Sequence, residues 1–328
     1  MAHHPVGHFR VMRTSQILIC VRVLSLLLTF LSFGLILTGC SGLHGSETIN
    51  SAAPTVNPAG PPFGHVFIVV EENHNYSDVI GSSSMPYLNS LATQYGLATQ
   101  YYANTHPSIG NYFMLTAGQI VTNDDSYVPP SAGLGVDNVA RELLTAGKTW
   151  KAYEENMLSP CFLGSTSGYA RRHDPLSYFS DVMGSSVQCQ NLVPFTQFAT
   201  DLANNQLPSY SFITPNLIDD AHDGTLQQAD TWLRVHIDPL IKSQEFQKDG
   251  LLIIVFDESG SDNTNGGGRV VAVLISPTSS KVGYQSTTLY QHQSVLRLTL
   301  EGLGVNRLPG AASTAPKMWE FFTFPPPS

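Results

Sequence analysis

Two continuous apolar segments that each end in a pair of carboxylates constrain this chain most. Residues 66–72 read VFIVVEE, and residues 251–258 read LLIIVFDE. Apolar runs of this length, without alternation, predict strands that are buried on both faces. Open α/β sheets place their ligands at the carboxyl ends of such strands. The sequence therefore predicts that two strands bring acidic groups to one edge of a sheet, which favours a metal-assisted site.

Strand and helix signals alternate along the rest of the chain. Helical patterns occupy residues 85–95, 138–147 and 226–240, and Ser294 is placed to cap a last helix. Further strand-like segments are residues 149–153, 209–214 and 270–275. Alternation of this kind predicts an α/β fold, a three-layer α/β/α sandwich in which helices cover both faces of a mostly parallel sheet.

The N-terminal region has the pattern of an export signal. Three arginines, Arg10, Arg13 and Arg22, precede an apolar run over residues 23–37, and small residues stand directly before Cys40. The pattern resembles a bacterial lipoprotein signal, in which the cysteine becomes the first mature residue and carries lipid. A plain secretory signal and an uncleaved membrane anchor are the alternatives.

This pattern predicts three parts in the chain. We expect a signal peptide over residues 1–39, a flexible Ser-, Gly-, Pro- and Ala-rich tether over 40–63, and a folded domain over 64–328. Lipid on Cys40 would hold the domain at a membrane surface without spanning it. We therefore expect an exported protein that is lipid-anchored in the cell envelope, on its periplasmic or extracellular face.

The charge balance limits the partners. The formal net charge is −9, and the basic residues are few and scattered, so we expect no nucleic-acid partner. The negative field gives no long-range attraction for phosphate esters. Any anionic substrate would therefore need local cations at its site.

Two cysteines, Cys161 and Cys189, remain in the predicted folded domain. In an exported protein we expect them to form a disulfide. Closing a loop of this size stabilises the fold by roughly 3–4 kcal/mol in the chain-entropy model. Two buried free thiols are the alternative.

Four segments lie just past a strand or at a helix start and carry reactive side chains, namely residues 71–76, 105–112, 214–224 and 257–260. Taken singly, each has a structural explanation: a solvated acidic turn, an N-cap serine at Ser108, or a turn rich in Asp and Gly. His292, just before a helix cap, is by itself more typical of a structural histidine. On a helix start, however, Ser108 and Asn111 would face the same point.

In their order along the chain, these segments resemble a bacterial phosphoesterase family that includes acid phosphatases and phospholipases C and belongs to the alkaline phosphatase superfamily. The resemblance extends from about residue 64 to residue 322. The matching motifs are Glu72-Asn73, Thr105-His106-Pro107-Ser108 with Asn111-Tyr112, Asp220-Ala221-His222-Asp223, Asp257-Glu258, and residues 169–175 and 290–297. The resemblance implies an alkaline-phosphatase-like fold and a phosphoesterase catalytic domain over residues 64–328.

The resemblance also implies one or two divalent metal ions. Our hypothesis is that the first ion, next to Ser108, is held by Glu72, Asn73, Asp257 and Glu258. A second ion, or the phosphate itself, would be bound by Asp220, His222 and His292. Oxygen ligands suit Mg²⁺, Ca²⁺ or Mn²⁺, whereas added histidines favour Zn²⁺ or iron.

The catalytic roles follow from the same hypothesis. Ser108 would be the nucleophile and would form a phosphoserine that water then hydrolyses. Asn111 would donate a hydrogen bond to a phosphoryl oxygen. His106 and His173 would contact the phosphate or protonate the leaving group.

The expected activity is metal-assisted hydrolysis of phosphate esters, most of all of monoesters as in acid phosphatases. A phospholipase C or phosphodiesterase acting on lipid head groups is the close alternative, and a lipid anchor would suit it. A non-catalytic lipoprotein that binds a metal or an anion is an alternative of another class. A glycosidase with paired carboxylates is a weaker alternative, since the three Trp residues do not cluster near the acidic motifs.

The chain departs from the family pattern in two ways. Gly110 stands where many relatives have proline, and the chain is shorter than phospholipase C members with extra C-terminal domains.

Overall fold

The first apolar segment forms strand β1 (His65–Glu71), which lies inside an eight-stranded sheet in the computed structural model. The structure describes residues 63–323. β1 pairs in parallel with β7 (Gly250–Phe256) on one side and with β6 (Tyr210–Thr214) on the other. Every residue of β7, and every residue of β1 after His65, is buried. The two carboxylate-ending strands are therefore direct neighbours.

The strand order of the sheet is β5-β4-β6-β1-β7-β8-β2-β9. The outer strands are β5 (Leu192–Pro194), β4 (Trp150–Glu154), β8 (Ala272–Ile275), β2 (Gly96–Ala98) and β9 (Gln285–Ser286). β8 is antiparallel to both neighbours, and the other pairs are parallel, so the prediction of a mostly parallel sheet is confirmed. β8 runs back because the chain returns from β7 without a crossover helix, which a parallel pair would need. Two short strands, β3 (Tyr101–Tyr102) and β10 (Tyr290–Gln291), pair separately.

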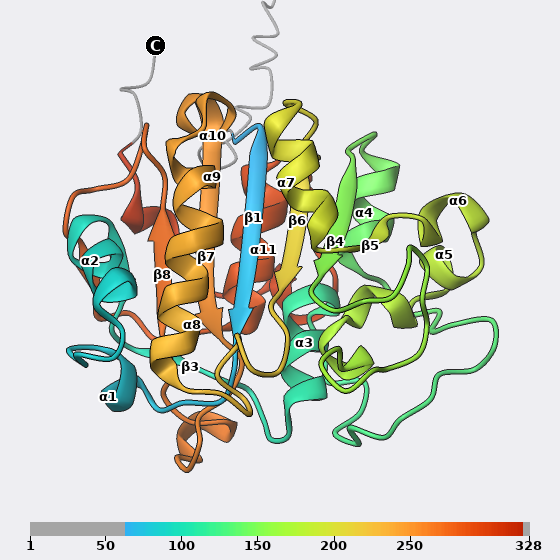
Figure 1. Cartoon of the computed structure of the whole chain (residues 1–328), viewed down its shortest axis with the longest axis horizontal. Helices are drawn as coiled ribbons and strands as arrows, with labels where there is room; N and C mark the ends of the chain where they lie inside the picture. The colour runs from blue at the N-terminus through green and yellow to red at the C-terminus, as the bar shows by residue number, and fades with distance from the viewer. Residues whose placement is uncertain (1–62, 324–328) are drawn as a thin grey trace, which may run out of the picture. The chain divides into compact units, whose positions relative to one another are not determined.

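Helices cover both faces of the sheet (Figure 1). In the view shown, the front layer holds α2 (Pro86–Gln94), α7 (Thr196–Ala203), α8 (Leu226–Trp232), α9 (Asp238–Lys242) and α10 (Gln244–Asp249). Behind the sheet lie α3 (Ser108–Ala117), α4 (Val139–Thr145) and α11 (His292–Gly302). The remaining helices are the single turns α1 (Tyr76–Val79), α5 (Ser180–Met183) and α6 (Ser186–Cys189). The predicted three-layer sandwich is thus confirmed.

Two predicted helices differ in detail. The helix expected over residues 226–240 is divided into α8, a π-helical turn over Leu233–Ile237, and α9. Pro239 explains the division, because it has no backbone N–H and its ring disfavours a continuous α-helical ladder. The last helix begins at His292 with Gln291 in the N-cap position, so the prediction that Ser294 caps it is wrong.

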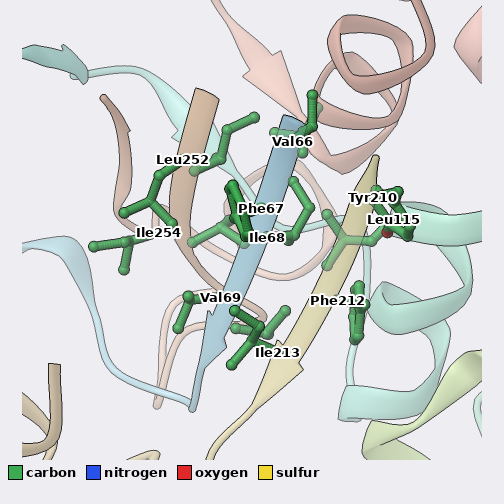
Figure 2. Packing of buried hydrophobic residues seen from close by; sticks show 14 of the residues in the cluster. Val66, Phe67, Ile68, Val69, Leu115, Tyr210, Phe212, Ile213, Leu252 and Ile254 are labelled. Atoms are coloured by element: carbon green, nitrogen blue, oxygen red, sulfur yellow. The ribbon is translucent and has the colours of Figure 1, made fainter. Parts of the chain in front are cut away.

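Apolar side chains pack on both sides of β1 (Figure 2). On one face, the ring of Phe67 lies 5.9 Å from that of Phe246 in α10. On the other, the ring of Tyr112 in α3 lies 6.2 Å from that of Phe212 in β6. The helix that begins at Ser108 is therefore anchored to β6, the direct neighbour of β1.

The predicted disulfide between Cys161 and Cys189 is confirmed, and it joins α6 to the loop after β4.

Across residues 63–323, no helix combines the length and the apolar character needed to cross a bilayer. The predicted signal peptide, Cys40 and nearly all of the predicted tether lie outside the described residues, and these remain predictions.

Candidate active site

The acidic groups of β1 and β7 meet at the carboxyl edge of the sheet. The two strands are parallel and in register, and the backbone N–H of Asp257 donates to the carbonyl of Glu71 over 3.0 Å. Because side chains alternate along a strand, Glu71 and Glu72 point to opposite faces. The N-terminus of α3 packs behind this edge and brings Ser108 to the face of Glu72.

The hydroxyl of Ser108 lies between two carboxylates. Its Oγ is 3.1 Å from Oε2 of Glu72 and 3.1 Å from Oε1 of Glu258. A hydroxyl has one proton to donate, so only one of these contacts is a donated hydrogen bond at a time. Ser108 is buried and already in contact with groups that can accept its proton.

A stacked pair of rings holds Glu72. Tyr112, one helical turn after Ser108, donates its phenolic hydrogen to Oε1 of Glu72 over 2.6 Å. The imidazole of His173 stacks on the Tyr112 ring with centroids 4.9 Å apart, and its Nε2 lies 3.2 Å from the same oxygen. The other ring nitrogen, Nδ1, lies 3.7 Å from Oδ2 of Asp220. His173 therefore links the first carboxylate group to Asp220.

His106 supports Glu258 from the other side. Its Nε2 lies 3.1 Å from the carbonyl oxygen of Asp262, which can only accept, so Nε2 carries a hydrogen. Its Nδ1 contacts Oε2 of Glu258 at 2.5 Å, which makes a hydrogen bond between the two side chains. Glu258 thus contacts both His106 and Ser108.

Burial and mutual repulsion make the carboxylates of the site hard to ionise without a cation. Burial raises the pKa of Glu72 to about 8; the hydrogen bond from Tyr112 opposes this rise, and repulsion from Glu258 adds to it. Burial, and then repulsion by Glu72 and Glu258, raise the pKa of Asp257 well above its ordinary value. Burial and the charge of Glu72 raise the pKa of Asp220 to about 9.

The donor set fits a bound metal ion. One ligand atom from each of Glu72, Asp257 and Glu258 lies within 4.8 Å of the others, and the same holds for Glu72, His173 and Asp220. Neither carboxylate oxygen of Asp257 makes a hydrogen bond of ordinary geometry to a described residue. Buried anionic oxygens without donors are costly unless a cation pairs with them. The two groups share Glu72, so the site offers positions for one ion or two.

The turn after β6 presents Asp220 and His222 under backbone strain. Ala221 has a φ of 73°, in the left-handed region that a residue with a Cβ seldom adopts. The strained turn lets the backbone N–H of His222 donate to Oδ1 of Asp220 over 2.7 Å. The half-buried His222 side chain pairs with Asp223 at 3.1 Å. Strain of this kind persists where the surrounding structure requires it, as at active sites.

Arg172 is a site residue that the sequence reasoning did not single out. Its Nη2 lies 3.5 Å from Nε2 of His222, and its Nε lies 3.5 Å from Oδ2 of Asp125. Its charge lowers the pKa of both Glu72 and Asp220, so it acts on the carboxylates of the site. The available signal was its place directly before His173 in the motif over residues 169–175.

Two predicted site residues occupy different positions from those expected. Both ring nitrogens of His292 are engaged, Nδ1 with the hydroxyl of Tyr101 at 2.9 Å and Nε2 with the carbonyl of Asp257 at 2.6 Å. Burial lowers the pKa of His292 to about 4, so the ring is neutral. With both nitrogens in hydrogen bonds, His292 positions the strand end behind Asp257 and has no lone pair directed to a metal.

Asn111 also supports the backbone instead of facing the reaction centre. Its Oδ1 accepts from the N–H groups of Asn104 and Thr105 at 2.9 and 3.1 Å, and its Nδ2 donates to the carbonyl of Thr105 at 2.9 Å. These bonds hold the loop that leads to Ser108. Asn73, the other predicted amide ligand, follows Glu72 in a half-buried position.

Comparison with known proteins agrees with the geometry. Residues 82–305 match the Phosphoesterase family. The chain is 34% identical to an acid phosphatase of Aspergillus fumigatus over 76% of this chain and 57% of that protein. It is 31% identical to a probable acid phosphatase of Kluyveromyces lactis, over 78% and 62% of the two lengths. The chain thus spans about three fifths of the length of these curated relatives. It is also 35% identical to a phosphatidylinositol-3-phosphatase of Mycobacterium tuberculosis, over 65% and 71%.

Solved structures with low sequence identity share the fold. One is a protein of the alkaline phosphatase superfamily from Vibrio parahaemolyticus, with a TM-score of 0.54 and 14% identity over 80% of this chain and 74% of that chain. Another is the lipoteichoic acid synthase of Listeria monocytogenes, with a TM-score of 0.54 and 12% identity over 75% and 74%. The fold is therefore alkaline-phosphatase-like, and the chain belongs to the phosphoesterase family.

Proposed function

We propose that this protein hydrolyses phosphate monoesters through a phosphoserine formed at Ser108. The observation that carries the proposal is the position of its hydroxyl, buried and within hydrogen-bond reach of Glu72 and Glu258. A serine hydroxyl is a weak nucleophile until a neighbouring base or cation activates it, and here two acceptors are already in contact. The match to the phosphoesterase family and the acid phosphatases among the relatives support this reaction class.

The proposed mechanism assigns each chemical event to a residue of the site. Oγ of Ser108 forms a bond to phosphorus while the bond from phosphorus to the leaving-group oxygen breaks, and the serine proton passes to Glu258. His106, in contact with the other oxygen of Glu258, would hold this carboxylate in position. Arg172, beside His222, would bind the phosphoryl oxygens and offset the negative field of the site. His222 would donate a proton to the leaving oxygen. Water would then bond to phosphorus and give a proton back to His222, while the bond from phosphorus to Oγ breaks and Oγ regains its proton from Glu258, which releases phosphate and restores the enzyme.

The carboxylates Glu72, Asp257 and Glu258 would hold a divalent ion, with Asn73 beside them. His173 and Asp220, together with Glu72, would form a second position. When bound, such a cation would favour the ionised serine and neutralise charge on the phosphoryl group. The all-oxygen group suits Mg²⁺, Ca²⁺ or Mn²⁺, whereas the group with His173 suits Zn²⁺ as well.

A phospholipid head group is the second substrate candidate. One relative that is 35% identical is named a phosphatidylinositol-3-phosphatase, which favours a monoester on a lipid over a diester. Export by a signal over residues 1–39 and lipid on Cys40 would place the enzyme at the membrane surface, where it would meet such substrates. Labelling with a radioactive fatty acid tests the anchor, because Cys40→Ser should abolish the label if the proposal is correct.

Turnover of p-nitrophenyl phosphate by the wild type and by Ser108→Ala tests the main proposal. We expect the variant to lose at least about a thousandfold in kcat, since removal of a nucleophile leaves only binding and electrostatic effects. Acid-quenched wild type should carry a phosphoryl group on Ser108 by mass spectrometry. A phosphocholine diester serves as the comparison substrate, and faster turnover of it than of the monoester would favour a diesterase. Undiminished monoesterase activity of Ser108→Ala would refute the mechanism.

A further inference from the structure

A cavity of about 330 Å³ lies beside the proposed active site. Its wall includes Asp125, Ser126, Tyr127, Ser165 and Arg172. The volume is at the small end of ligand pockets, which span roughly 300–1,000 Å³. It offers room for one small ring and not for a long chain.

Two contacts tie this cavity to the nucleophile. Oδ1 of Asp125 accepts from the backbone N–H of Ile109, the residue directly after Ser108, over 3.2 Å. Oδ2 of Asp125 lies 3.5 Å from Nε of Arg172, whose Nη2 lies 3.5 Å from His222. The cavity therefore shares Arg172 with the place where the phosphoryl group would bind, and a substrate held by Arg172 would extend its alcohol part into the cavity.

The cavity combines an aromatic surface with hydroxyl groups. The ring of Tyr127 is nearly parallel to that of Tyr178, at 14° and with centroids 6.4 Å apart. The guanidinium of Arg171, which also lines the cavity, packs on the Tyr178 ring at 4.7 Å. Tyr127 itself is half-buried. Ser126 and Ser165 also line the cavity. The hydroxyl of Ser126 donates to Oδ1 of Asp124 over 2.6 Å and can still accept, and that of Ser165 accepts from the backbone N–H of Arg171 over 3.1 Å and can still donate.

Such a surface suits a hydroxylated ring. The C–H faces of sugars and cyclitols pack on aromatic rings, while their hydroxyls need donors and acceptors around the rim. We propose that this cavity is the leaving-group pocket of the enzyme and that it selects a polyhydroxylated ring alcohol, with Tyr127 as the specificity-determining residue. This inference rests on the proposed phosphomonoesterase function and names the substrate class for it.

Steady-state kinetics with three esters test the pocket. Glucose 6-phosphate and myo-inositol 1-phosphate carry hydroxylated rings, whereas ethyl phosphate presents the same phosphoryl group on a small leaving group. The wild type should prefer the ring esters in kcat/KM. Tyr127→Ala should lower kcat/KM for them by roughly three- to tenfold, the size of one aromatic contact, mainly through KM. Turnover of ethyl phosphate should change less than twofold.

Tyr127→Phe is the matched control, because it keeps the ring and should keep the preference. Tyr127→Leu replaces Tyr127→Ala if the smaller residue destabilises the loop. Equal losses for ring and ethyl esters in either variant, or equal kcat/KM for all three esters in the wild type, would overturn the pocket assignment. A difference between the sugar and the cyclitol ester identifies which ring the pocket takes.

Calorimetric binding to Ser108→Ala separates this inference from the proposed function. If the wild type hydrolyses no ester, the function is wrong, yet the pocket is still judged by binding. Tighter binding of ring esters than of ethyl phosphate, lost on adding Tyr127→Ala, supports the pocket. The same affinity for all three esters rejects it.

Discussion

Glu72 is the residue on which most contacts of the site converge. It accepts from Tyr112, lies 3.1 Å from the hydroxyl oxygen of Ser108 and next to His173, and belongs to both groups of metal-ligating atoms. Its ionisation therefore couples the nucleophile, the buried rings and any bound cation. Substitution of a side chain that contacts Glu72 should therefore change the pH dependence of the activity as well as its magnitude.

Tyr112→Phe should shift the pH profile. The phenolic hydrogen bond lowers the pKa of Glu72, so its removal raises that pKa and moves the acidic limb of the kcat/KM profile to higher pH. We also expect a loss of activity of roughly ten- to hundredfold, consistent with losing one hydrogen bond to a charged group. Tyr153→Phe is the control, because Tyr153 is a buried tyrosine whose hydroxyl bonds Asp201 instead. A Tyr112→Phe profile that superimposes on the wild type would contradict the role of Glu72.

His292→Ala should separate positioning from metal ligation. Because His292 bonds Tyr101 and the backbone of Asp257, its loss should lower the free energy of unfolding by roughly 2–3 kcal/mol, as for buried groups left without partners. The metal content at saturation, measured by atomic emission, should equal that of the wild type. Unchanged stability together with the loss of a bound metal would instead identify His292 as a ligand.

At the scale of elements, the site combines two rigid strands with several irregular loops. β1 and β7 place the carboxylates, and α3 places Ser108 and Tyr112 on one helical face. The segment that carries Arg172 and His173 lies between β4 and β5 and contains only short helical turns. Its geometry depends on cross-links, and the disulfide between Cys161 and Cys189 closes a loop of 28 residues around it.

The disulfide should stabilise this loop segment. Replacing both cysteines by serine should lower the free energy of unfolding by about 3–4 kcal/mol, the loop-closure value for this separation. Urea unfolding of the wild type, with and without reductant, measures it. Because the loop carries Arg172 and His173, activity should also fall before the protein unfolds. A double variant with unchanged stability would mean that tertiary contacts alone hold the loop.

At the scale of the whole molecule, the site is a concentration of buried negative charge in a chain that is already acidic. Glu72, Asp257 and Asp220 all have raised pKa values because of burial and mutual repulsion. A group whose folded pKa is raised stabilises the fold fully below its ordinary pKa, and this contribution is lost as the pH rises through the folded pKa. Without a cation, the molecule should therefore be most stable in mild acid.

Chelation should expose this pH dependence. In a chelator-treated protein, the Tm should fall steadily between about pH 4 and pH 9, the window from the ordinary pKa of a carboxyl group to the raised pKa values of about 8 for Glu72 and about 9 for Asp220. Added Mg²⁺, Mn²⁺ or Zn²⁺ should raise the Tm most at the alkaline end, because the ion replaces the protons. Scanning calorimetry at several pH values measures both. A Tm of the chelated protein that rises over this range would contradict the charge assignment.

Much of the fold was predictable from the sequence because its signals are local. Buried parallel strands appear as uninterrupted apolar runs, so β1, β6 and β7 and the acids that end β1 and β7 could be found without the structure. The break between α8 and α9 and the start of α11 were missed, because helical periodicity does not reveal where a proline turn or a cap interrupts it. Ordered motifs also pointed to the phosphoesterase family, to which the chain belongs.

What the tertiary structure alone decided is which side chains touch. The contact of Tyr112 with Glu72 spans 40 residues and that of His292 with Tyr101 spans 191, so no local pattern records either. Arg172 acquires its position only when a loop folds over the sheet edge beside His222. Residue type and order are enough to predict strands and candidate chemistry, because backbone propensity and burial act locally. The partners of each polar atom depend on packing between distant segments, and packing is set only when the whole chain has folded.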